Sequence, residues 1–530
     1  MRLSIWRAAR LGLVALAILI LALGFTQGQD ALWAPLSQMA RVPDLNAGGD
    51  LTLPPPPRMV YAPEDPETQP DDGTPVVPSD RLPSHTPSSS ETPWIFYETQ
   101  SGDTLSALAV RFGVRVEEIQ GPEDLPTKGF LPPGTQLRIP ARPVPSTSDE
   151  RLFPDSELVN SPSAVGFDIR DFVEQAGGYL AEYTQYLPSP GRMSGYEVVR
   201  FVALNYSINP RLLLALLEFR ARWVFGTPPT EEARRYPMGT RETPAEDLYR
   251  QLRWAAEQLA EGYYGWREGR LTQLTFPNGE MLFLAPTLNA GTVALMYYFA
   301  QLYPRATWER ILDPGNPDGF LAFYESLFGN PWYRAQRVEP LYPPDLRQPR
   351  MILPFARGAV WFLTSGPHGA YGEQGAWAAL DFAPLGAQGC YTSRAWVLAP
   401  APGKVVRSER GVVVLDLDGD GHEETGWVLF FLHIATQDRV PVGTLVERGG
   451  LIGHPSCEGG RATGTHVHIA RRYNGEWMAA AGPVPFNLGG WVVYGGEEVR
   501  EGYLKRGDQV VEASMYGGEK ARIIRTETDP

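Results

Sequence analysis

Residues 464–470 read GTHVHIA, a segment in which two histidines stand two positions apart. Side chains at positions i and i+2 of an extended strand lie on the same face, so His466 and His468 are expected to point to one side of a sheet. His433 lies in a second apolar run, FFLHIA at 430–435, where a buried imidazole needs a polar partner. Six of the seven histidines follow residue 367. The chemistry of the chain is therefore expected in its last third.

The sequence around these histidines is typical of β-structure. Apolar runs, as in GKVVRSERGVVVLDLDGDGHEETGWVLFFLHI at 403–434, are separated by Gly, Pro and Asp turns. We expect residues 346–530 to form an antiparallel β-sheet domain with a C-terminal extension.

A further histidine lies upstream of this region. Residues 366–382 read GPHGAYGEQGAWAALDF and place His368 thirteen residues before Asp381. Together with the H-x-H segment, this pattern resembles the lysostaphin/LytM-type zinc endopeptidases, and specifically their staphylolysin-like branch, over roughly residues 355–486. In the commonest form of that family a histidine stands four residues before the aspartate, where this chain has Trp377. The staphylolysin-like branch takes its first ligand from farther upstream, which matches His368.

The resemblance implies a zinc ion bound by His368, Asp381 and His468. It also implies that His433 and His466 form the catalytic pair outside the coordination sphere. Two neutral imidazoles and one carboxylate leave zinc a net charge of about +1 and an open position for a water of lowered pKa. The two other imidazoles can share deprotonation of that water and stabilisation of the oxyanion.

The resemblance, together with the N-terminal segment and the module at 94–142, implies an exported, peptidoglycan-binding zinc metalloendopeptidase that hydrolyses peptide stems or cross-bridges of the bacterial cell wall. The alternative is a catalytically silent wall-binding scaffold that activates or recruits a cell-wall amidase. Such scaffolds usually lack the metal ligands, whereas this chain keeps all of them. A formal net charge of −14 argues against nucleic acid as a partner, because phosphate-binding surfaces need clustered Lys and Arg.

Residues 97–119 carry the signals of a small separate module. Apolar residues recur at three- and four-residue steps from Leu105 to Phe112, directly after two residues suited to a helix N-cap. Together with LPPGTQLRIP at 131–140, the segment resembles a LysM module, which implies a βααβ fold over 94–142 that binds N-acetylglucosamine-containing glycans. The alternative is a spacer that binds little or no sugar. The implied glycan-binding residues are Gly102, Asp103, Thr104, Leu105, Pro133 and Gly134.

Between the two lies a region, residues 164–345, in which apolar residues recur at helical spacing and predict an all-α domain. Its segment YSINPRLLLALLEFRARWV at 206–224 resembles the first core helices of lysozyme-like transglycosylases. The catalytic glutamate of those enzymes falls on Arg220, which cannot act as a general acid because it keeps its proton. Glu218 lies about 200° around the helix from that position. We therefore expect a degenerate domain without glycosidase activity.

The N-terminus is expected to direct export. Arg2, Arg7 and Arg10 precede an uncharged apolar run from Leu11 to Phe25. Residues 1–29 are therefore interpreted as a signal peptide or a membrane anchor, which gives a secreted or membrane-anchored protein that faces the cell wall. Two Pro- and Ser-rich segments, 30–93 and 143–163, are expected to be linkers.

Two features beside the main motif leave alternatives open. Asp416, Asp418 and Asp420 form a D-x-D-x-D-G string that could ligate Ca²⁺, but Trp427 stands where such a loop needs a bidentate acid, so a solvated hairpin turn is favoured. In an exported chain Cys390 and Cys457 can pair as a disulfide, or they can remain free thiols.

Overall fold

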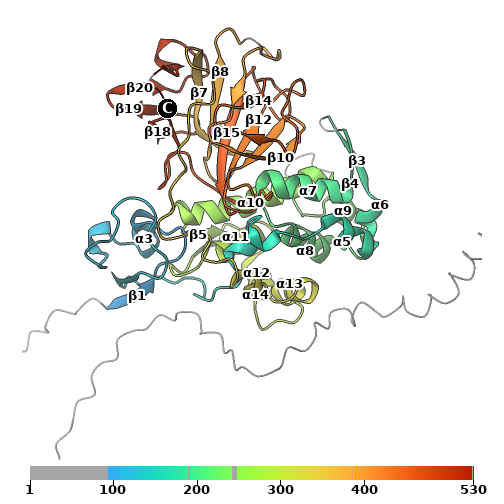
Figure 1. Cartoon of the computed structure of the whole chain (residues 1–530). Helices are drawn as coiled ribbons and strands as arrows, with labels where there is room; N and C mark the ends of the chain where they lie inside the picture. Colours follow the sequence, from blue (N-terminus) through green and yellow to red (C-terminus); the bar gives the residue numbers. More distant parts are fainter. Residues whose placement is uncertain (1–92, 189–190, 242–246, 388, 528, 530) are drawn as a thin grey trace, which may run out of the picture. The chain divides into compact units, whose positions relative to one another are not determined.

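A computed structural model describes residues 93–530, apart from 189–190, 242–246, 388, 528 and 530 (Figure 1). The expected signal or anchor segment, and the first linker up to residue 92, lie outside the described residues. Among the residues that the structure describes, no helix is long and apolar enough to cross a lipid bilayer.

The LysM region folds as a two-stranded sheet and one regular helix. Its elements are β1 (Trp94–Glu98), α3 (Leu105–Phe112), the 3-10 turn η2 (Val116–Glu118) and β2 (Gln136–Pro140). The Thr104 hydroxyl accepts a hydrogen bond from the Ala107 amide, which is the expected N-cap, and Gly113 ends the helix in the left-handed region. The second helix of the expected βααβ order is thus reduced to a three-residue turn.

The middle region is largely helical, but it is not all-α as expected. Two pairs of short antiparallel strands interrupt the helices, namely β3 (Thr184–Leu187) with β4 (Gly191–Ser194), and β5 (Gln273–Thr275) with β6 (Met281–Phe283). The helices are α4 (Asp155–Leu158), η3 (Pro162–Ala164), α5 (Ile169–Ala176), α6 (Tyr179–Glu182), α7 (Gly195–Tyr206), α8 (Pro210–Ala221), α9 (Glu231–Arg235), α10 (Leu248–Arg267), α11 (Ala290–Ala300), α12 (Arg305–Leu312), α13 (Phe320–Phe328) and α14 (Pro331–Ala335).

The prediction that residues 143–163 form a linker is wrong for the later half of this segment. Residues 153–161 are all buried, and Phe153, Leu158 and Val159 belong to the hydrophobic core of the helical region. The Asp155 carboxylate accepts hydrogen bonds from the Asn289 side chain and the Gly291 amide, which ties the segment to the start of α11. The helical region therefore begins about ten residues earlier than the composition suggested.

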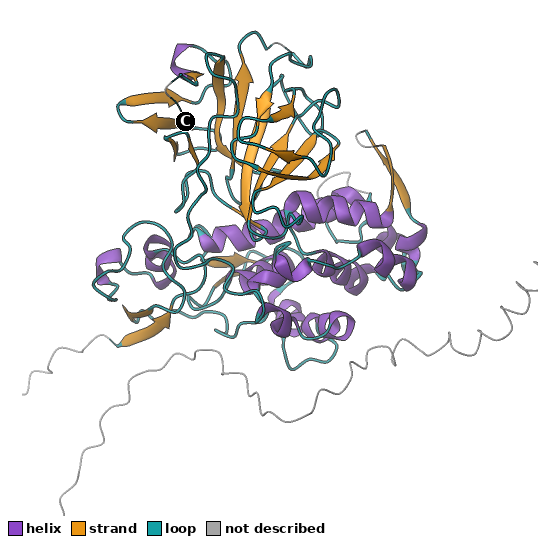
Figure 2. Ribbon diagram, in the orientation of Figure 1, coloured by secondary structure: helices purple, strands orange, loops and turns teal. Residues whose placement is uncertain are grey.

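The last third forms the expected antiparallel sheet. In the described residues eight strands pair in the order β13-β10-β11-β12-β15-β8-β7-β21, and a ninth, β16, pairs with β15 outside this path. Strands are drawn in orange in Figure 2. The strands of this sheet are β7 (Val360–His368), β8 (Ala379–Pro384), β10 (Gly403–Glu409), β11 (Val412–Asp416), β12 (Trp427–Leu432), β13 (Leu445–Val446), β15 (Val467–Tyr473), β16 (Glu476–Trp477) and β21 (Arg522–Ile524). A separate two-stranded sheet is formed by β9 (Val397–Leu398) and β14 (Leu451–Gly453). The C-terminal extension adds a further sheet, β17 (Asn487–Leu488), β18 (Trp491–Gly495), β19 (Gly502–Arg506) and β20 (Gln509–Glu512), and the turn η4 (Glu519–Ala521).

The central strands of the large sheet are apolar on both faces because both faces are covered. Alternate residues of β11 and β12, such as Val413 and Phe431, pack in the core of the sheet domain itself. Their neighbours Val414 and Phe430 pack in the same cluster as the helical region. Each such fully buried side chain contributes about 1.5–3 kcal/mol relative to an exposed one. Continuous apolar runs are the expected sequence for strands buried on both sides.

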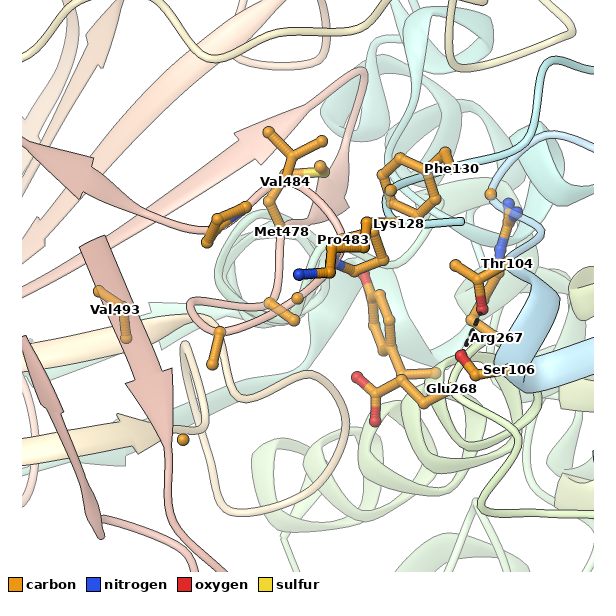
Figure 3. Close-up of a pocket in the computed structure, with 18 of the residues that line it drawn as sticks. Thr104, Ser106, Lys128, Phe130, Arg267, Glu268, Met478, Pro483, Val484 and Val493 are labelled. Carbon is orange, nitrogen blue, oxygen red and sulfur yellow. Dashed lines mark hydrogen bonds between the residues drawn. The ribbon is translucent and has the colours of Figure 1, made fainter. Parts of the chain in front are cut away.

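A cavity of about 720 Å³ is lined by all three regions (Figure 3). The LysM region contributes Thr104 and Phe130, the helical region contributes Glu268, and the sheet domain contributes Tyr494 and Tyr503. The rings of the two tyrosines stack with their centroids 5.0 Å apart.

Candidate metal and catalytic site

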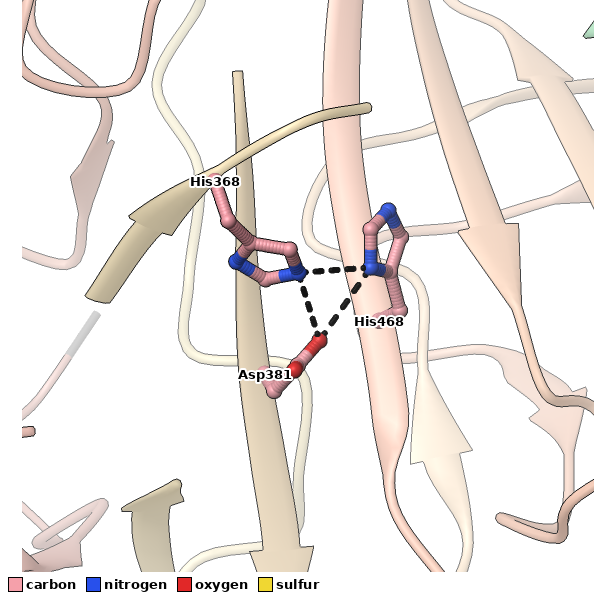
Figure 4. Close-up of side chains that lie close together, drawn as sticks. All are labelled: His368, Asp381 and His468. Atoms are coloured by element: carbon pink, nitrogen blue, oxygen red, sulfur yellow. Dashed lines mark hydrogen bonds and ion pairs between the residues drawn. The ribbon is translucent and has the colours of Figure 1, made fainter. Parts of the chain in front are cut away.

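Two of the predicted metal ligands are neighbours in the sheet. Asp381 on β8 and His468 on β15 are directly paired in the antiparallel register. Asp381 Oδ1 lies 3.2 Å from His468 Nδ1 (Figure 4). Strand pairing alone therefore brings together two residues that are far apart in the sequence.

The third predicted ligand, His368, reaches the same point from the end of β7. The register of β7 against β8 shifts twice between Leu363 and His368, and such irregularities re-aim side chains. His368 Nε2 lies 3.3 Å from Asp381 Oδ1 and 3.0 Å from His468 Nδ1. All three side chains are buried, with residue exposures of 4–6%.

The hydrogen bonds of the two imidazoles show which nitrogens face the centre. A carbonyl oxygen only accepts, so His368 Nδ1 donates to Gly366 O at 2.9 Å and His468 Nε2 donates to Ala370 O at 2.8 Å. The other nitrogens, His368 Nε2 and His468 Nδ1, therefore carry lone pairs. Backbone partners of this kind commonly fix the tautomer of metal-ligating histidines.

The set fits a divalent metal ion. Three acceptor atoms converge within 3.0–3.3 Å, and Asp381 Oδ1 is buried without a hydrogen-bond donor from the described residues. Ligands of a tetrahedral zinc, about 2.0–2.2 Å from the ion, are separated by roughly 3.3–3.6 Å. Buried lone pairs this close together repel unless a cation lies among them. Two nitrogens and one carboxylate oxygen are a donor set that zinc favours.

The two predicted catalytic histidines lie beside this centre. The rings of His433 and His466 have centroids 4.4 Å apart, and His466 Nε2 is 3.6 Å from Asp381 Oδ1. His433 Nδ1 donates to Glu458 O and His466 Nδ1 donates to Gly464 O, which leaves both Nε2 atoms as acceptors. His433 has a φ of +65°, a strained backbone conformation that is often retained at functional sites.

Burial disfavours the protonated form of two imidazoles in this cluster. It lowers the pKa of His433 to about 3, with the nearby imidazoles His466 and His468 acting in the same direction. Burial also lowers the pKa of His468. For Asp381, burial opposes ionisation, but the adjacent His368 imidazole outweighs it and holds the pKa of the carboxyl well below its usual value. The site therefore combines an ionised carboxylate with two imidazoles, His433 and His468, whose protonation is disfavoured by burial, and metal binding requires ligands in these unprotonated forms.

Two residues near the centre were missed by sequence reasoning. The Ser365 hydroxyl lies 3.1 Å from His368 Nδ1, and the Arg500 guanidinium lies 3.6 Å from Asp381 Oδ2. No sequence signal marks either residue, because Ser365 depends on the irregular register of β7 and Arg500 lies in the C-terminal extension beyond the region of family resemblance.

The structure joins Cys390 and Cys457 in a disulfide between two loops, with a Cα–Cα distance of 5.4 Å. Asp416 is fully buried and accepts hydrogen bonds from the amides of Asp418, Gly419 and Gly421. Carboxylate oxygens of the three aspartates lie within 4.8 Å of one another, but these backbone contacts are those of a hairpin turn, and nothing else supports calcium.

Only some of the residues expected to bind glycan line the cavity between the three regions. Gly102, Thr104 and Leu105 line the cavity of Figure 3, whereas Pro133 and Gly134 are not part of its lining. Asp103 is 2% exposed, and its carboxylate accepts from Tyr97 OH, the Gln100 amide and Arg111. Since its acceptors are used within the module, we assign Asp103 a structural role.

In the helical region, Glu218 and Arg220 both make local contacts. The Glu218 carboxylate accepts hydrogen bonds from the Val224 and Phe225 amides and thereby holds the segment that follows α8 against the helix. Arg220 donates to Tyr303 OH. Both side chains are therefore used in local structure.

Comparisons with known proteins point to the same kind of metallopeptidase that the sequence resembles. A family model described as LasA, N-terminal domain matches residues 151–342, and a LysM domain model matches residues 97–140. Protease LasA of Pseudomonas aeruginosa is 27% identical over 383 residues, which cover 67% of this chain and 80% of the relative.

Among solved structures, the M23 metalloprotease pseudoalterin from the deep sea is 22% identical, with 31% of this chain and 96% of that chain covered and a TM-score of 0.27. The catalytic domain of lysostaphin from Staphylococcus simulans is 20% identical, with 23% and 87% covered and a TM-score of 0.16. The LasA relatives and the two family models support a LytM-type peptidase that carries a LysM domain.

Proposed function

We propose that this protein is a zinc metalloendopeptidase that hydrolyses peptide stems or cross-bridges of the bacterial cell wall outside the cytoplasm. The observation that carries the proposal is the convergence of three buried acceptor atoms, His368 Nε2, Asp381 Oδ1 and His468 Nδ1, within 3.0–3.3 Å. A zinc ion held there would polarise the scissile carbonyl and lower the pKa of a water molecule.

The residues beside the centre supply the proton transfers. In this mechanism Nε2 of His466 takes a proton from the attacking water as the water oxygen bonds to the amide carbon. The imidazolium then returns that proton to the amide nitrogen as the C–N bond breaks, and a carboxylic acid and an amine are released. His433, which burial keeps neutral, offers a second acceptor that orients the same water. Its backbone partner, Glu458 O, fixes the tautomer.

The LysM region supports a role at the wall. Its match to the LysM model suggests that it binds N-acetylglucosamine-containing glycan. Thr104 and Leu105 remain on the lining of the cavity and are the residues of the predicted set best placed for this contact. Holding the glycan would raise the local concentration of cleavable peptide without any change in the catalytic centre.

Zinc content and product analysis test the proposal on the full chain. We expect about one zinc ion per chain by elemental analysis, and new amino termini by mass spectrometry of digested peptidoglycan. Release of reducing sugar ends instead would assign glycan cleavage, and an intact wall with a metal-free chain would assign a scaffold.

A further inference from the structure

The loop between β18 and β19 places an arginine at the metal centre. Residues 496–501 form this loop, and Arg500 lies near its end. Arg500 Nη1 is 3.6 Å from Asp381 Oδ2 and donates to the Ser365 hydroxyl at 3.4 Å. Asp381 thus turns one oxygen toward the histidines and the other toward this guanidinium.

Backbone contacts fix the position of Arg500 on the ligand strand. The Gly366 amide donates to Arg500 O at 2.8 Å, and the Arg500 amide donates to Pro367 O at 2.9 Å. A Cβ atom at Gly366 would lie 2.4 Å from Glu501 O, so only glycine permits this approach. Arg500 itself has a φ of +74°, a strained conformation for a residue with a side chain. The loop is therefore anchored two residues from the ligand His368.

Most hydrogen-bond donors of the Arg500 guanidinium remain available to a ligand. Its side chain is 59% exposed. The contacts with Asp381 and Ser365 are both long, and Nη1 makes both of them. An arginine has five N–H donors in a planar fork that matches a carboxylate. With a divalent ion bound near Asp381, positive charge would exceed negative charge at this point, which favours an anionic partner.

We infer that Arg500 is a specificity-determining residue that binds a free carboxylate of the substrate peptide beside the scissile bond. This inference rests on the proposed peptidase function. Peptide stems of the cell wall carry such carboxylates, and a bidentate contact to one would favour these peptides over their amidated forms. Because hydrogen bonds to charged groups contribute about 1.5–3 kcal/mol, the preference is expected to be roughly tenfold or more.

The test uses the full zinc-loaded chain and a soluble stem pentapeptide, prepared with free carboxylates and with those carboxylates converted to carboxamides. For the wild type we expect about tenfold higher kcat/KM for the carboxylate form, expressed mainly in KM. In Arg500→Gln the preference should fall below about twofold, because kcat/KM for the carboxylate form falls much more than kcat/KM for the carboxamide form, and the zinc content should be retained. Lys505→Gln is the matched control, because it removes one exposed positive charge from the same hairpin.

Binding without turnover separates this inference from the proposed function. Calorimetry on His466→Ala should show about tenfold tighter binding of the carboxylate peptide, and the added Arg500→Gln change should abolish that difference. If the wild type cleaves neither peptide, the peptidase proposal fails while the calorimetric result still decides the role of Arg500. Equal losses for both peptides in Arg500→Gln, or loss of zinc, would overturn the inference.

Discussion

Asp381 lies directly opposite His468 on neighbouring antiparallel strands, with Oδ1 of the carboxylate 3.2 Å from Nδ1 of the imidazole. The alternation of side chains along a strand means that a one-residue slip of either strand would turn its ligand to the opposite face of the sheet, away from the other ligand. Phe431 of β12 and Ile469 of β15 are paired and both pack in the core of the sheet domain, so burial of these side chains also constrains the geometry of the candidate metal site.

The carboxylate is expected to be essential for metal binding. Asp381→Asn retains the size of the side chain but removes the negative charge that faces the imidazoles of His368 and His468. We expect zinc affinity to fall by at least about 100-fold, measured by competition with a chelator, with the circular dichroism spectrum unchanged. Asp438→Asn, at an exposed carboxylate, should bind zinc as the wild type does. Full zinc retention in Asp381→Asn would contradict the assigned ligand set.

His466→Ala is expected to abolish turnover and spare the metal. The imidazole is held beside the centre by Gly464 O, but its Nε2 lies outside the three converging ligand atoms. Loss of a proton-transfer group should lower kcat by about 10²–10⁴-fold, measured on soluble wall fragments at saturating substrate. His422→Ala, at an exposed histidine, serves as the control and should keep wild-type activity.

Arg267 is expected to be a major contributor to stability. Its Nη2 contacts the buried carboxylates of Asp155 and Glu476, each at 2.9 Å, and so links the helical region to the sheet domain. Arg267→Met leaves both carboxylates without that cation and should cost about 3–5 kcal/mol in urea unfolding. Arg270→Met removes a half-exposed arginine from the same region and should cost less than about 1 kcal/mol.

Glu423 is expected to make the protein sensitive to acid. Burial raises the pKa of this carboxyl, but the contacting guanidiniums of Arg407 and Arg472 outweigh it, and its pKa is lowered from the usual 4.5. The unfolded chain then binds a proton more readily than the folded chain, so this contribution to stability is complete above pH 4.5.

As the pH falls below that value, the contribution decreases, and it is lost once the folded pKa is passed. Urea unfolding at pH 7 and pH 4 measures the change. Glu423→Gln should be less stable at pH 7 and should show a smaller loss between the two pH values. An equal loss in both proteins would show that Glu423 does not carry the effect.

Part of the site could be predicted from sequence because it follows from local periodicity. The spacing of His466 and His468 needs only an extended strand to place both rings on one face. The position of His368 could be inferred only through family resemblance, since it depends on two register shifts in β7 that no residue pattern signals. Arg500 was not predicted, because its contact depends on how a distant hairpin docks on that strand.

The linker prediction for residues 143–163 failed in part because composition reports local polarity and not burial by distant parts of the chain. Residues 153–161 contain Pro, Ser, Asp and Glu, which are typical of linkers, yet the helical region buries them because partners such as Asn289 satisfy their polar groups. The β3–β4 and β5–β6 pairs have three or four residues per strand, too short for a clear alternating pattern.

The two-sided burial of β11 and β12 has a consequence for the sheet domain on its own. Val412, Val414, Phe430 and Leu432 are shielded by packing with the helical region, and Ala470, two residues after His468, belongs to the same layer. A truncated protein consisting of the sheet domain alone would expose this apolar surface to water, next to the candidate metal site. Such a fragment should self-associate unless detergent or another binding surface takes over the shielding.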